Sequence, residues 1–412
     1  MRVVIVGAGA AGCFCAVNLK RRCPDAEVVV LESKSKALAK VAITGGGRCN
    51  LTNSFLNIRS VKQAYPRGEK FMKRGLKVFS NEDTMEWFER EGVRLVVQED
   101  QCVFPQSQDA MEIVNTLVRL MQRLGVKLLL NTKVTSLSVN EDNNFTVNAD
   151  TPTEENSFEA THVVVATGGS RQALPFPIIS EKPCNNDSIE VSTPVPSLFT
   201  FNISDSDLHA LMGTVVENVT ARLSGTKYQS DGAILITHWG LSGPAILKLS
   251  SYAARYLAEC DYKAELSINW FGEEKEKEVL SALIILQMHN PQKQISTVYP
   301  RVFNQRHWLY IINKVGLAAQ KRWQEVGPKQ MTRLASLLTN DSYAIAGKGQ
   351  FKDEFVTCGG IALSCLNLNT LESKYFPNLY FAGEVIDVDA ITGGFNLQAA
   401  WTMGYIVANS IE

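Results

Sequence analysis

The first 32 residues combine two short apolar runs with one helical pattern. Residues 2–6 (RVVIV) and 27–32 (EVVVLE) are apolar enough to be buried strands, and residues 10–22 place Ala, Phe, Val and Leu on one side of a helix. A strand, a glycine turn, a helix and a second strand in close succession form the βαβ unit of a parallel sheet. The N-terminal segment therefore predicts an α/β fold.

Similar patterns continue through the first half of the chain and return at its end. Helices are predicted at 82–91 and 109–124, and strands at 126–130, 133–139, 145–150 and 162–166. The glycine-rich, polar stretch 41–53 predicts a loop. From residue 379 the chain again predicts a buried strand, a glycine loop and a helix at about 396–411. The simplest assembly is one sheet-based domain built from both chain ends, with the middle inserted into it.

The middle of the chain has a different character. Residues 171–197 contain five prolines and predict a linker. Residues 198–270 alternate apolar and polar positions in short runs, which predicts antiparallel strands. Residues 273–338 are rich in helix formers and have helical spacing, and strand character returns at 343–347 and 353–357. The insert therefore combines a β domain with a small helical subdomain.

Composition narrows the classes of partner and the compartment. The formal net charge is −1, which gives no electrostatic reason to expect nucleic acid as the main partner, although a local basic patch stays compatible with it. No apolar stretch is long enough for a membrane span, and Met1-Arg2 leads directly into a strand without room for a signal peptide. The nine cysteines form no C-x-x-C and no zinc-like cluster. We expect a cytoplasmic protein without a metal site.

The turn between the first strand and helix has the spacing of a dinucleotide site. Gly7 allows the tight turn, Gly9 lets the backbone approach a pyrophosphate, and Gly12 lets the helix pack closely on the strand. Glu32 ends the second strand, 20 residues after Gly12, where an acidic side chain binds a ribose hydroxyl. An acidic residue there favours FAD or NAD over NADP, and the spacing alone does not separate FAD from NAD.

Three further segments carry a family resemblance. They are KVAITGGGRCNLTN at 40–53, LITHWGLSGPAI at 235–246 and FAGEVIDVDAITGGFNLQAAW at 381–401. With the glycine turn, they make the chain resemble the HI0933-like, or BaiN-type, family of FAD-dependent flavoproteins over nearly its whole length. The resemblance implies an α/β fold: a glutathione-reductase-type FAD-binding (Rossmann-like) domain with an inserted antiparallel β-barrel domain and a small helical subdomain.

The resemblance and the pattern together suggest domain boundaries. The predicted parts are the FAD-binding domain at 1–190 and 357–412, the barrel at 191–272 with a return strand at 341–356, and the helical subdomain at 273–340.

The resemblance also assigns residues to FAD. The ADP half is expected at Gly7, Gly9, Ala10, Ala11, Gly12 and Glu32, with Lys40 near the ribose, the backbone of Val134 at the adenine, and Thr167 and Gly168 at the pyrophosphate. Gly383 and Glu384 would meet the ribityl chain and phosphates. The flavin would be wrapped by Thr44, Gly45, Gly46, Arg48, Cys49 and Asn50, and its pyrimidine edge would face Gly393, Gly394, Phe395, Asn396 and Leu397. A helix N-terminus there stabilises negative charge on the reduced ring.

One departure from the family pattern concerns the segment after Thr167-Gly168-Gly169. Relatives usually have a longer stretch with a TGDGY-like element close to the flavin, and Asn186-Asp187-Ser188 is the only remnant that this chain offers. The absence of the TGDGY-like element bears on substrate specificity and on activity.

Two residues are candidates for catalysis. Arg48 is the strong cation of the glycine loop and would orient an anionic substrate or stabilise reduced flavin, or else bind loop carbonyls structurally. His238 would be an acid or base, or would position the barrel. Asp387 and Asp389 would transfer protons or fix their loop. Cys49 and Cys358 are small buried residues by default.

The resulting prediction is an FAD-dependent oxidoreductase that transfers hydride between flavin N5 and a small organic substrate. Activated C=C bonds and small amines are the substrate classes that the family suggests. No second GxGxxG occurs between 150 and 350, so NADH or NADPH binds transiently at the flavin face or the substrate itself is the reductant. The alternatives are a flavin-dependent RNA-modifying or RNA-binding protein and a flavin-binding protein without catalysis.

Overall fold

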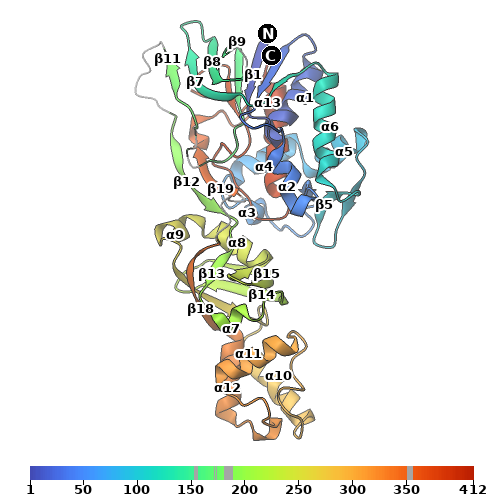
Figure 1. Cartoon of the computed structure of the whole chain (residues 1–412), viewed down its shortest axis with the longest axis vertical. Helices are drawn as coiled ribbons and strands as arrows, with labels where there is room; N and C mark the ends of the chain where they lie inside the picture. Colours follow the sequence, from blue (N-terminus) through green and yellow to red (C-terminus); the bar gives the residue numbers. More distant parts are fainter. Residues whose placement is uncertain (153–155, 171, 173, 181–188, 350–355) are drawn as a thin grey trace. The chain divides into compact units, whose positions relative to one another are not determined.

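The computed structural model describes residues 1–412 except 153–155, 171, 173, 181–188 and 350–355. Its contacts divide the chain into two units, Met1–Val195 with Val356–Glu412, and Pro196–Phe355. The first unit thus contains both chain ends (Figure 1). The predicted boundaries at 190 and 356 lie a few residues away, because β12 (Val191–Ser197) pairs with β19 (Val356–Ile361).

A parallel five-stranded sheet forms the centre of the first unit. Its strand order is β20-β10-β1-β2-β6, with β1 (Arg2–Val6), β2 (Glu27–Leu31), β6 (Lys127–Leu129), β10 (His162–Val165) and β20 (Leu379–Phe381). Nearly every residue of β1 is buried, which is typical of a parallel strand covered on both faces. The sheet therefore joins the first and last segments of the chain, as the pattern predicted.

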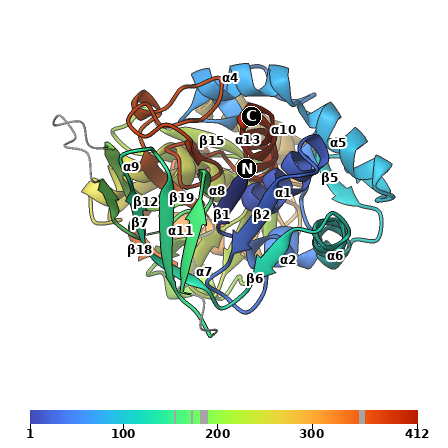
Figure 2. The same ribbon diagram turned by 90° about the horizontal axis from the view of Figure 1, so that it is seen from above.

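Smaller sheets and helices complete the first unit (Figures 1 and 2). One sheet has the order β11-β7-β8-β9, and another has β3-β5-β4. Their bounds are β3 (Thr52–Asn53), β4 (Leu95–Val97), β5 (Cys102–Pro105), β7 (Lys133–Val139), β8 (Phe145–Asp150), β9 (Ser157–Ala160) and β11 (Ile178–Ser180). The helices are α1 (Ala10–Arg22), α2 (Ala39–Gly47), α3 (Val61–Ala64), α4 (Glu69–Val78), α5 (Asn81–Arg90), α6 (Ala110–Arg123), α13 (Phe395–Ser410) and the 3₁₀ turn η2 (Leu363–Cys365).

Two sequence predictions in this unit were only partly right. The stretch 41–53 was expected to be a loop, but α2 continues to Gly47 across a kink whose non-helical residues are Thr44, Gly45 and Gly46. Residues 171–197 were expected to be a linker, yet they contain β11 and β12. Glycine and proline content misled both predictions, because glycines also permit a kink and proline occurs in edge strands.

The second unit contains a closed antiparallel barrel with the strand order β13-β16-β15-β14-β17-β18. Its strands are β13 (Phe201–Ile203), β14 (Val215–Leu223), β15 (Gln229–Thr237), β16 (Gly240–Ser242), β17 (Ala264–Asn269) and β18 (Asp341–Lys348). Its helices are α7 (Ser206–His209), α8 (Pro244–Tyr252), α9 (Ala254–Glu259), α10 (Glu276–His289), α11 (Gln305–Val315), η1 (Trp323–Glu325) and α12 (Pro328–Thr339). The predicted barrel and helical subdomain are confirmed, and they share one hydrophobic core.

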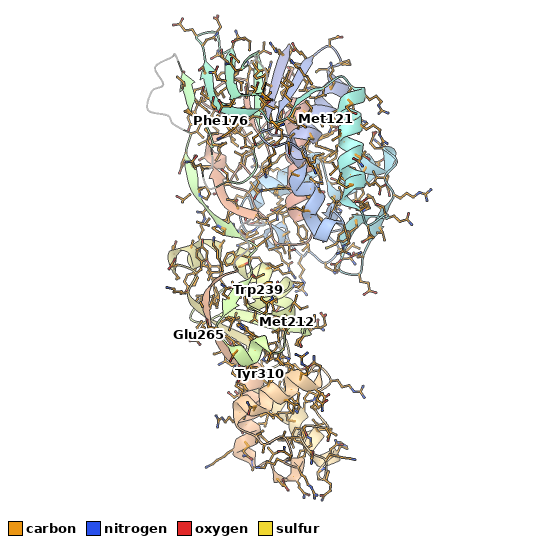
Figure 3. The ribbon with its side chains drawn as sticks, in the orientation of Figure 1. Met121, Phe176, Met212, Trp239, Glu265 and Tyr310 are labelled. Carbon is orange, nitrogen blue, oxygen red and sulfur yellow. The ribbon has the colours of Figure 1, made fainter. Side chains whose placement is uncertain are left out.

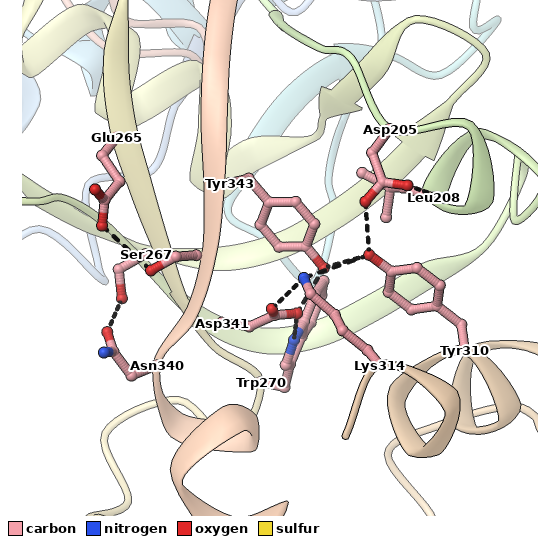
Figure 4. Close-up of polar contacts among 11 residues, drawn as sticks. Asp205, Leu208, Glu265, Ser267, Trp270, Tyr310, Lys314, Asn340, Asp341 and Tyr343 are labelled. Carbon is pink, nitrogen blue, oxygen red and sulfur yellow. Dashed lines mark hydrogen bonds and ion pairs between the residues drawn. The ribbon is translucent and has the colours of Figure 1, made fainter. Parts of the chain in front are cut away.

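A buried polar network ties α11 to the barrel (Figure 4). The fully buried Asp341 carboxylate accepts hydrogen bonds from Trp270 Nε1 at 3.0 Å and from Tyr343 Oη at 2.5 Å. Lys314 Nζ lies 2.5 Å from the same carboxylate and neutralises it. Burial raises the pKa of Asp341, whereas Lys314 lowers it. A buried charge of this kind requires such partners, so the network fixes α11 in one position.

Among the described residues, no helix combines the length and the apolar character that crossing a membrane requires.

His307 on α11 makes the stability of the second unit depend on pH. Its imidazole is fully buried, with ring centroids 4.6 Å from Trp270 and 5.0 Å from Phe303. Neither ring nitrogen has a hydrogen-bond partner in the described part of the chain. Burial, with a smaller effect of Lys314, lowers the pKa of His307 to about 4. The folded protein therefore holds this histidine neutral.

Because an unfolded histidine has a pKa of about 6.5, only the unfolded state gains a proton as pH falls from there toward 4. The contribution of neutral His307 to the free energy of unfolding is complete above pH 6.5 and is lost as the pH falls from 6.5 toward 4. Between pH 7 and pH 5 the free energy of unfolding of the wild type should fall by about 2 kcal/mol more than that of His307→Phe. Urea unfolding followed by tryptophan fluorescence measures this, with exposed His289→Phe as the control. Identical pH dependence in His307→Phe and wild type would contradict a buried neutral histidine.

Candidate functional site

The glycine turn after β1 has the close contacts that its spacing predicts. Gly7 has φ +108°, and a Cβ on it would lie 2.4 Å from the carbonyl oxygen of Ala166. A Cβ on Gly12 would lie 2.0 Å from the carbonyl oxygen of Gly7, so any side chain there would push α1 away from the turn. Gly9 has no atom within 4 Å of its Cβ position. The turn is therefore tight on the protein side and open at Gly9, where a ligand can approach.

The N-terminus of α1 is suited to an anion. Gly9 caps the helix, and no described side chain binds the free N–H groups of the first turn, which includes Ala10 and Ala11. Beside β1, at the end of β10, the buried hydroxyl of Thr167 has no hydrogen-bond partner among the described residues. Uncapped N–H groups, the positive end of the helix dipole and an unpaired buried hydroxyl all fit a pyrophosphate.

Glu32 is held at the end of β2 by backbone groups. Its carboxylate accepts hydrogen bonds from the N–H of Ala8 and of Lys34, both at 2.9 Å. The N–H of Thr132 donates to the Glu32 carbonyl at 2.8 Å, which places the start of β7, with Val134, beside this strand end. A carboxylate has about four acceptor sites, so capacity remains for a ribose hydroxyl.

The C-terminal segment reaches the same place. Glu384 accepts a hydrogen bond from the N–H of Thr357 at 2.7 Å, and its other oxygen lies 3.1 Å from Lys40 Nζ. A Cβ on Gly383 would lie 3.0 Å from the Cβ of Ala11, and one on Gly168 would lie 4.0 Å from Glu384 Oε2. The structure thus brings together the residues that were assigned to the ADP half, the phosphates and the ribityl chain.

The segment assigned to the flavin presents an open surface. Gly45 and Gly46 have φ +58° and +70° at the kink of α2, and no atom lies within 4 Å of the Cβ positions of Gly46 and Gly47. Ile43, on the same turn, is 69% exposed. A side-chain-free, partly apolar surface of this kind fits a planar ring.

Hydrogen bonds join this segment to the start of α13. Asn53 Nδ2 donates to the Gly393 carbonyl at 3.0 Å, and Trp401 Nε1 donates to the Leu51 carbonyl at 3.0 Å. A Cβ on Gly394 would lie 2.3 Å from the Thr52 carbonyl oxygen. Gly394 has no side chain to cap α13, and no described side chain binds the N–H groups of Phe395, Asn396 and Leu397, whereas the Asn50 amide lies at the N–H of Gly394. The two halves of the predicted flavin face are therefore adjacent.

The remaining flavin-face residues have mixed roles. Asn396 exchanges hydrogen bonds with the backbone of Ala390, at 2.9 and 3.0 Å, so its side chain braces the loop. Phe395 packs edge-on against Phe55, and Leu397 is half-buried. Burial raises the pKa of Cys49 to about 12, which keeps it a neutral thiol.

The two catalytic candidates lie in different units. Arg48 is exposed, its Nε donates to the Gly45 carbonyl at 3.0 Å, and its guanidinium lies 4.5 Å from the Phe104 ring centroid. Arg48 thus binds a loop carbonyl, which is the structural alternative to a catalytic role. His238 is an exposed turn residue between β15 and β16, and its ring centroid lies 4.3 Å from that of Trp239, which Figure 3 labels.

The carboxylates after Glu384 lie close together, and one of them is fully buried. Asp389 is fully buried and pairs with Arg67, whose Nε donates to it at 2.6 Å. The ligand atoms of Cys358, Asp387 and Asp389 lie within 4.8 Å of one another. Because the guanidinium already neutralises Asp389, the pair accounts for loop fixation without a metal. Asn186-Asp187-Ser188 lies outside the described residues.

Several residues that build this site were not predicted from the sequence. Tyr65 Oη donates to the Phe395 carbonyl at 2.9 Å, and Gln398 bonds Thr52 Oγ1 at 2.6 Å. Arg67 was missed as well. No local signal marks them, because each partner is more than 300 residues away in the sequence.

The comparisons with known proteins show the family of the chain. The model of the family described as HI0933-like protein Rossmann domain matches residues 1–410. The chain belongs to the HI0933-like family.

Curated relatives match along nearly their whole length. A ribosomal RNA dihydrouridine synthase of Haemophilus influenzae is 27% identical, with 99% of this chain and 98% of the relative covered. The protein of the same name from Escherichia coli is 26% identical (99% and 97% covered), as is a 3-dehydro-bile acid delta(4,6)-reductase of Clostridium scindens (99% and 98%).

A solved structure has the same fold. The 3-ketosteroid-delta4-(5alpha)-dehydrogenase of Rhodococcus jostii superposes with a TM-score of 0.50 at 16% identity, covering 99% of this chain and 96% of that one. Membership of this family indicates an FAD-dependent oxidoreductase, and the solved structure shows the shared fold alone.

Glu32→Gln tests the ribose contact. Replacing a charged acceptor by a neutral one removes about 1–1.5 kcal/mol, so the Kd of the apoprotein for FAD should rise about tenfold. Fluorescence quenching of added FAD measures it. Exposed Glu89→Gln on α5 makes the same chemical change away from the turn and should leave the Kd unchanged. Equal Kd values for Glu32→Gln and wild type would show that Glu32 does not contact the cofactor.

Proposed function

We propose that this protein is an FAD-dependent reductase that saturates a C=C bond conjugated to a carbonyl group. When bound and reduced, FAD would supply a hydride from N5 to the electron-poor carbon of the double bond. The adjacent carbon would take up a proton, so that the double bond becomes a single bond. Small organic molecules and pyrimidine bases both contain such bonds.

The observation that carries this proposal is the joined flavin face, where Gly46 and Gly47 are open and Asn53, a few residues further on, binds the Gly393 carbonyl at the start of α13. Free N–H groups at a helix N-terminus stabilise negative charge on the pyrimidine edge, which favours the reduced cofactor. The open side leaves a flat substrate room to stack. Exposed Arg48, on the same turn, is the residue that we assign to orienting the substrate carbonyl oxygen.

The names of the relatives support the same reaction class. A dihydrouridine synthase adds hydrogen across the 5,6 double bond of a uracil, and a 3-dehydro delta(4,6)-reductase removes ring unsaturation conjugated to a ketone. Both are additions to a C=C bond activated by a carbonyl group. We extend to this chain the chemistry that the two names share.

We further propose that NADH or NADPH reduces the flavin by binding transiently at this open face. The motif of a second dinucleotide site is absent between residues 150 and 350, so a resident nicotinamide is not expected.

A second candidate function is reduction of uracil within RNA. The observation that favours it is a cluster of exposed cations on residues 59–77, beside the flavin loop. This candidate shares the reaction and differs only in the molecule that carries the double bond.

Anaerobic reoxidation tests the reaction. Protein whose flavin has been photoreduced should regain the oxidised absorbance when mixed with an α,β-unsaturated ketone or with a uridine-containing ribosomal RNA fragment, whichever is its acceptor. The saturated ketone and the dihydrouridine fragment are matched controls and should leave the flavin reduced. Reoxidation by neither acceptor, together with rapid reoxidation by a quinone, would contradict the proposal.

Arg48→Gln separates catalysis from cofactor binding in the same assay. Loss of the charged donor to the substrate oxygen should slow reoxidation by about 10- to 100-fold while the flavin spectrum persists. Exposed Arg119→Gln on α6 should react at the wild-type rate. An unchanged rate in Arg48→Gln would assign this arginine to loop structure alone.

A further inference from the structure

Residues 57–80 carry a positive net charge, although the net charge of the whole chain is close to zero. The segment contains seven Lys or Arg residues and one acidic residue, Glu69, whereas the formal net charge of the entire chain is −1. The rest of the chain is therefore acidic on balance. Six of the seven cations are exposed: Arg59, Lys62, Lys70, Lys73, Arg74 and Lys77.

The helix α4 presents most of these cations on one face. Its apolar side is buried through Phe71, Met72 and Gly75, and a Cβ on Gly75 would lie 3.0 Å from Thr402 Cγ2 on α13. Lys70, Lys73, Arg74 and Lys77 repeat at helical spacing on the opposite side. Figure 2 shows α4 at the periphery of the view. We call the six exposed cations the basic α3–α4 surface.

The cations of this surface are available to a ligand. Within the described part of the chain, no ion pair engages any of the six side chains. Like charges placed side by side repel each other, so the arrangement costs stability until an anion neutralises it. The seventh cation, Arg67, is the one already paired inside the protein.

The surface is connected to the flavin loop by direct contacts. Arg67 precedes α4 and pairs with buried Asp389, and a Cβ on Gly68 would lie 2.5 Å from the Val388 side chain. Tyr65 binds the backbone of Phe395 at the start of α13. A ligand bound along α4 would therefore lie close to the residues assigned to the flavin.

We propose that the basic α3–α4 surface binds the phosphate backbone of an RNA and so delivers a base of that RNA to the flavin. Regularly spaced cations suit a repeating phosphate chain. A membrane surface fits less well, since an interfacial helix inserts its apolar face and that face of α4 is buried against α13. The inference rests on the proposed function only in that RNA would carry the double bond that is reduced.

The test measures RNA binding without turnover. A fluorescein-labelled fragment of ribosomal RNA is titrated with FAD-loaded protein, and anisotropy is recorded at several salt concentrations. The variant Lys70→Gln/Lys73→Gln/Arg74→Gln/Lys77→Gln should bind about 100-fold or more weakly near 0.1 M salt. Its slope of log K against log salt should be shallower by up to about 3, since single-stranded contacts contribute about 0.7 each.

A matched variant controls for overall charge. Lys277→Gln/Lys293→Gln/Lys329→Gln/Arg333→Gln removes four exposed cations from the helical region of the second unit and should keep wild-type affinity and slope. Retained flavin absorbance shows that the first unit is folded in both variants, and an unchanged far-UV circular dichroism spectrum shows the same for the second unit. Equal weakening in the two variants, or no RNA binding by wild type, would overturn the proposal. So would binding of wild type to phosphatidylserine vesicles, but not to RNA, when that binding is lost in the α4 variant.

The outcome is separable from that of the reductase proposal. RNA binding that depends on α4, without reoxidation of the flavin by any unsaturated acceptor, would support the surface and reject the reaction. Reoxidation by a small enone, with no RNA binding, would reject the surface and keep the reaction.

Discussion

The close contact between the first and last helices determines where every other part of the site lies. A Cβ on Gly404 of α13 would lie 2.6 Å from the carbonyl oxygen of Ala11 and 3.2 Å from the N–H nitrogen of Cys15, both on α1. Only a glycine lets the two backbones approach this closely. The same two ends of the chain meet in the sheet, where β10 lies between β1 and β20. One unit therefore contains the N-termini of two helices, and each is free of a side-chain cap.

The N-termini of α1 and α13 are suited to different parts of FAD, a long cofactor with an uneven charge. The end of α1, with its glycine turn and the unpaired hydroxyl of Thr167, fits the anionic pyrophosphate. The end of α13 fits the edge of the ring where charge develops on reduction. Between them, Glu384 connects Lys40 with the backbone at Thr357. The site is thus closely packed on the protein side and open at Gly9, Gly46 and Gly47, where ligand is expected, which fits the preorganisation that binding and hydride transfer require.

Local pattern predicted the elements whose signal is contained within a short stretch. The β1–α1–β2 unit, the barrel and α13 follow from runs and spacing that lie within one segment. FAD was suggested by the family resemblance that the glycine segments carry. The kink in α2 was not predictable, because glycines at 45–47 look the same in a loop and at the end of a helix. Arg67 and Tyr65 were missed for a different reason: their importance comes from partners more than 300 residues away. The net charge of the chain did not reveal the basic segment, because the remaining residues are acidic on balance and offset it.

A crystal structure of the protein with its bound cofactor tests the central claim most directly. The account predicts one FAD in the first unit, with its pyrophosphate at the N-terminus of α1 beside Thr167, its ribose at Glu32 and its pyrimidine edge at Gly394. A flavin placed elsewhere, or a cofactor that spans Gly9 without reaching α13, would contradict the account.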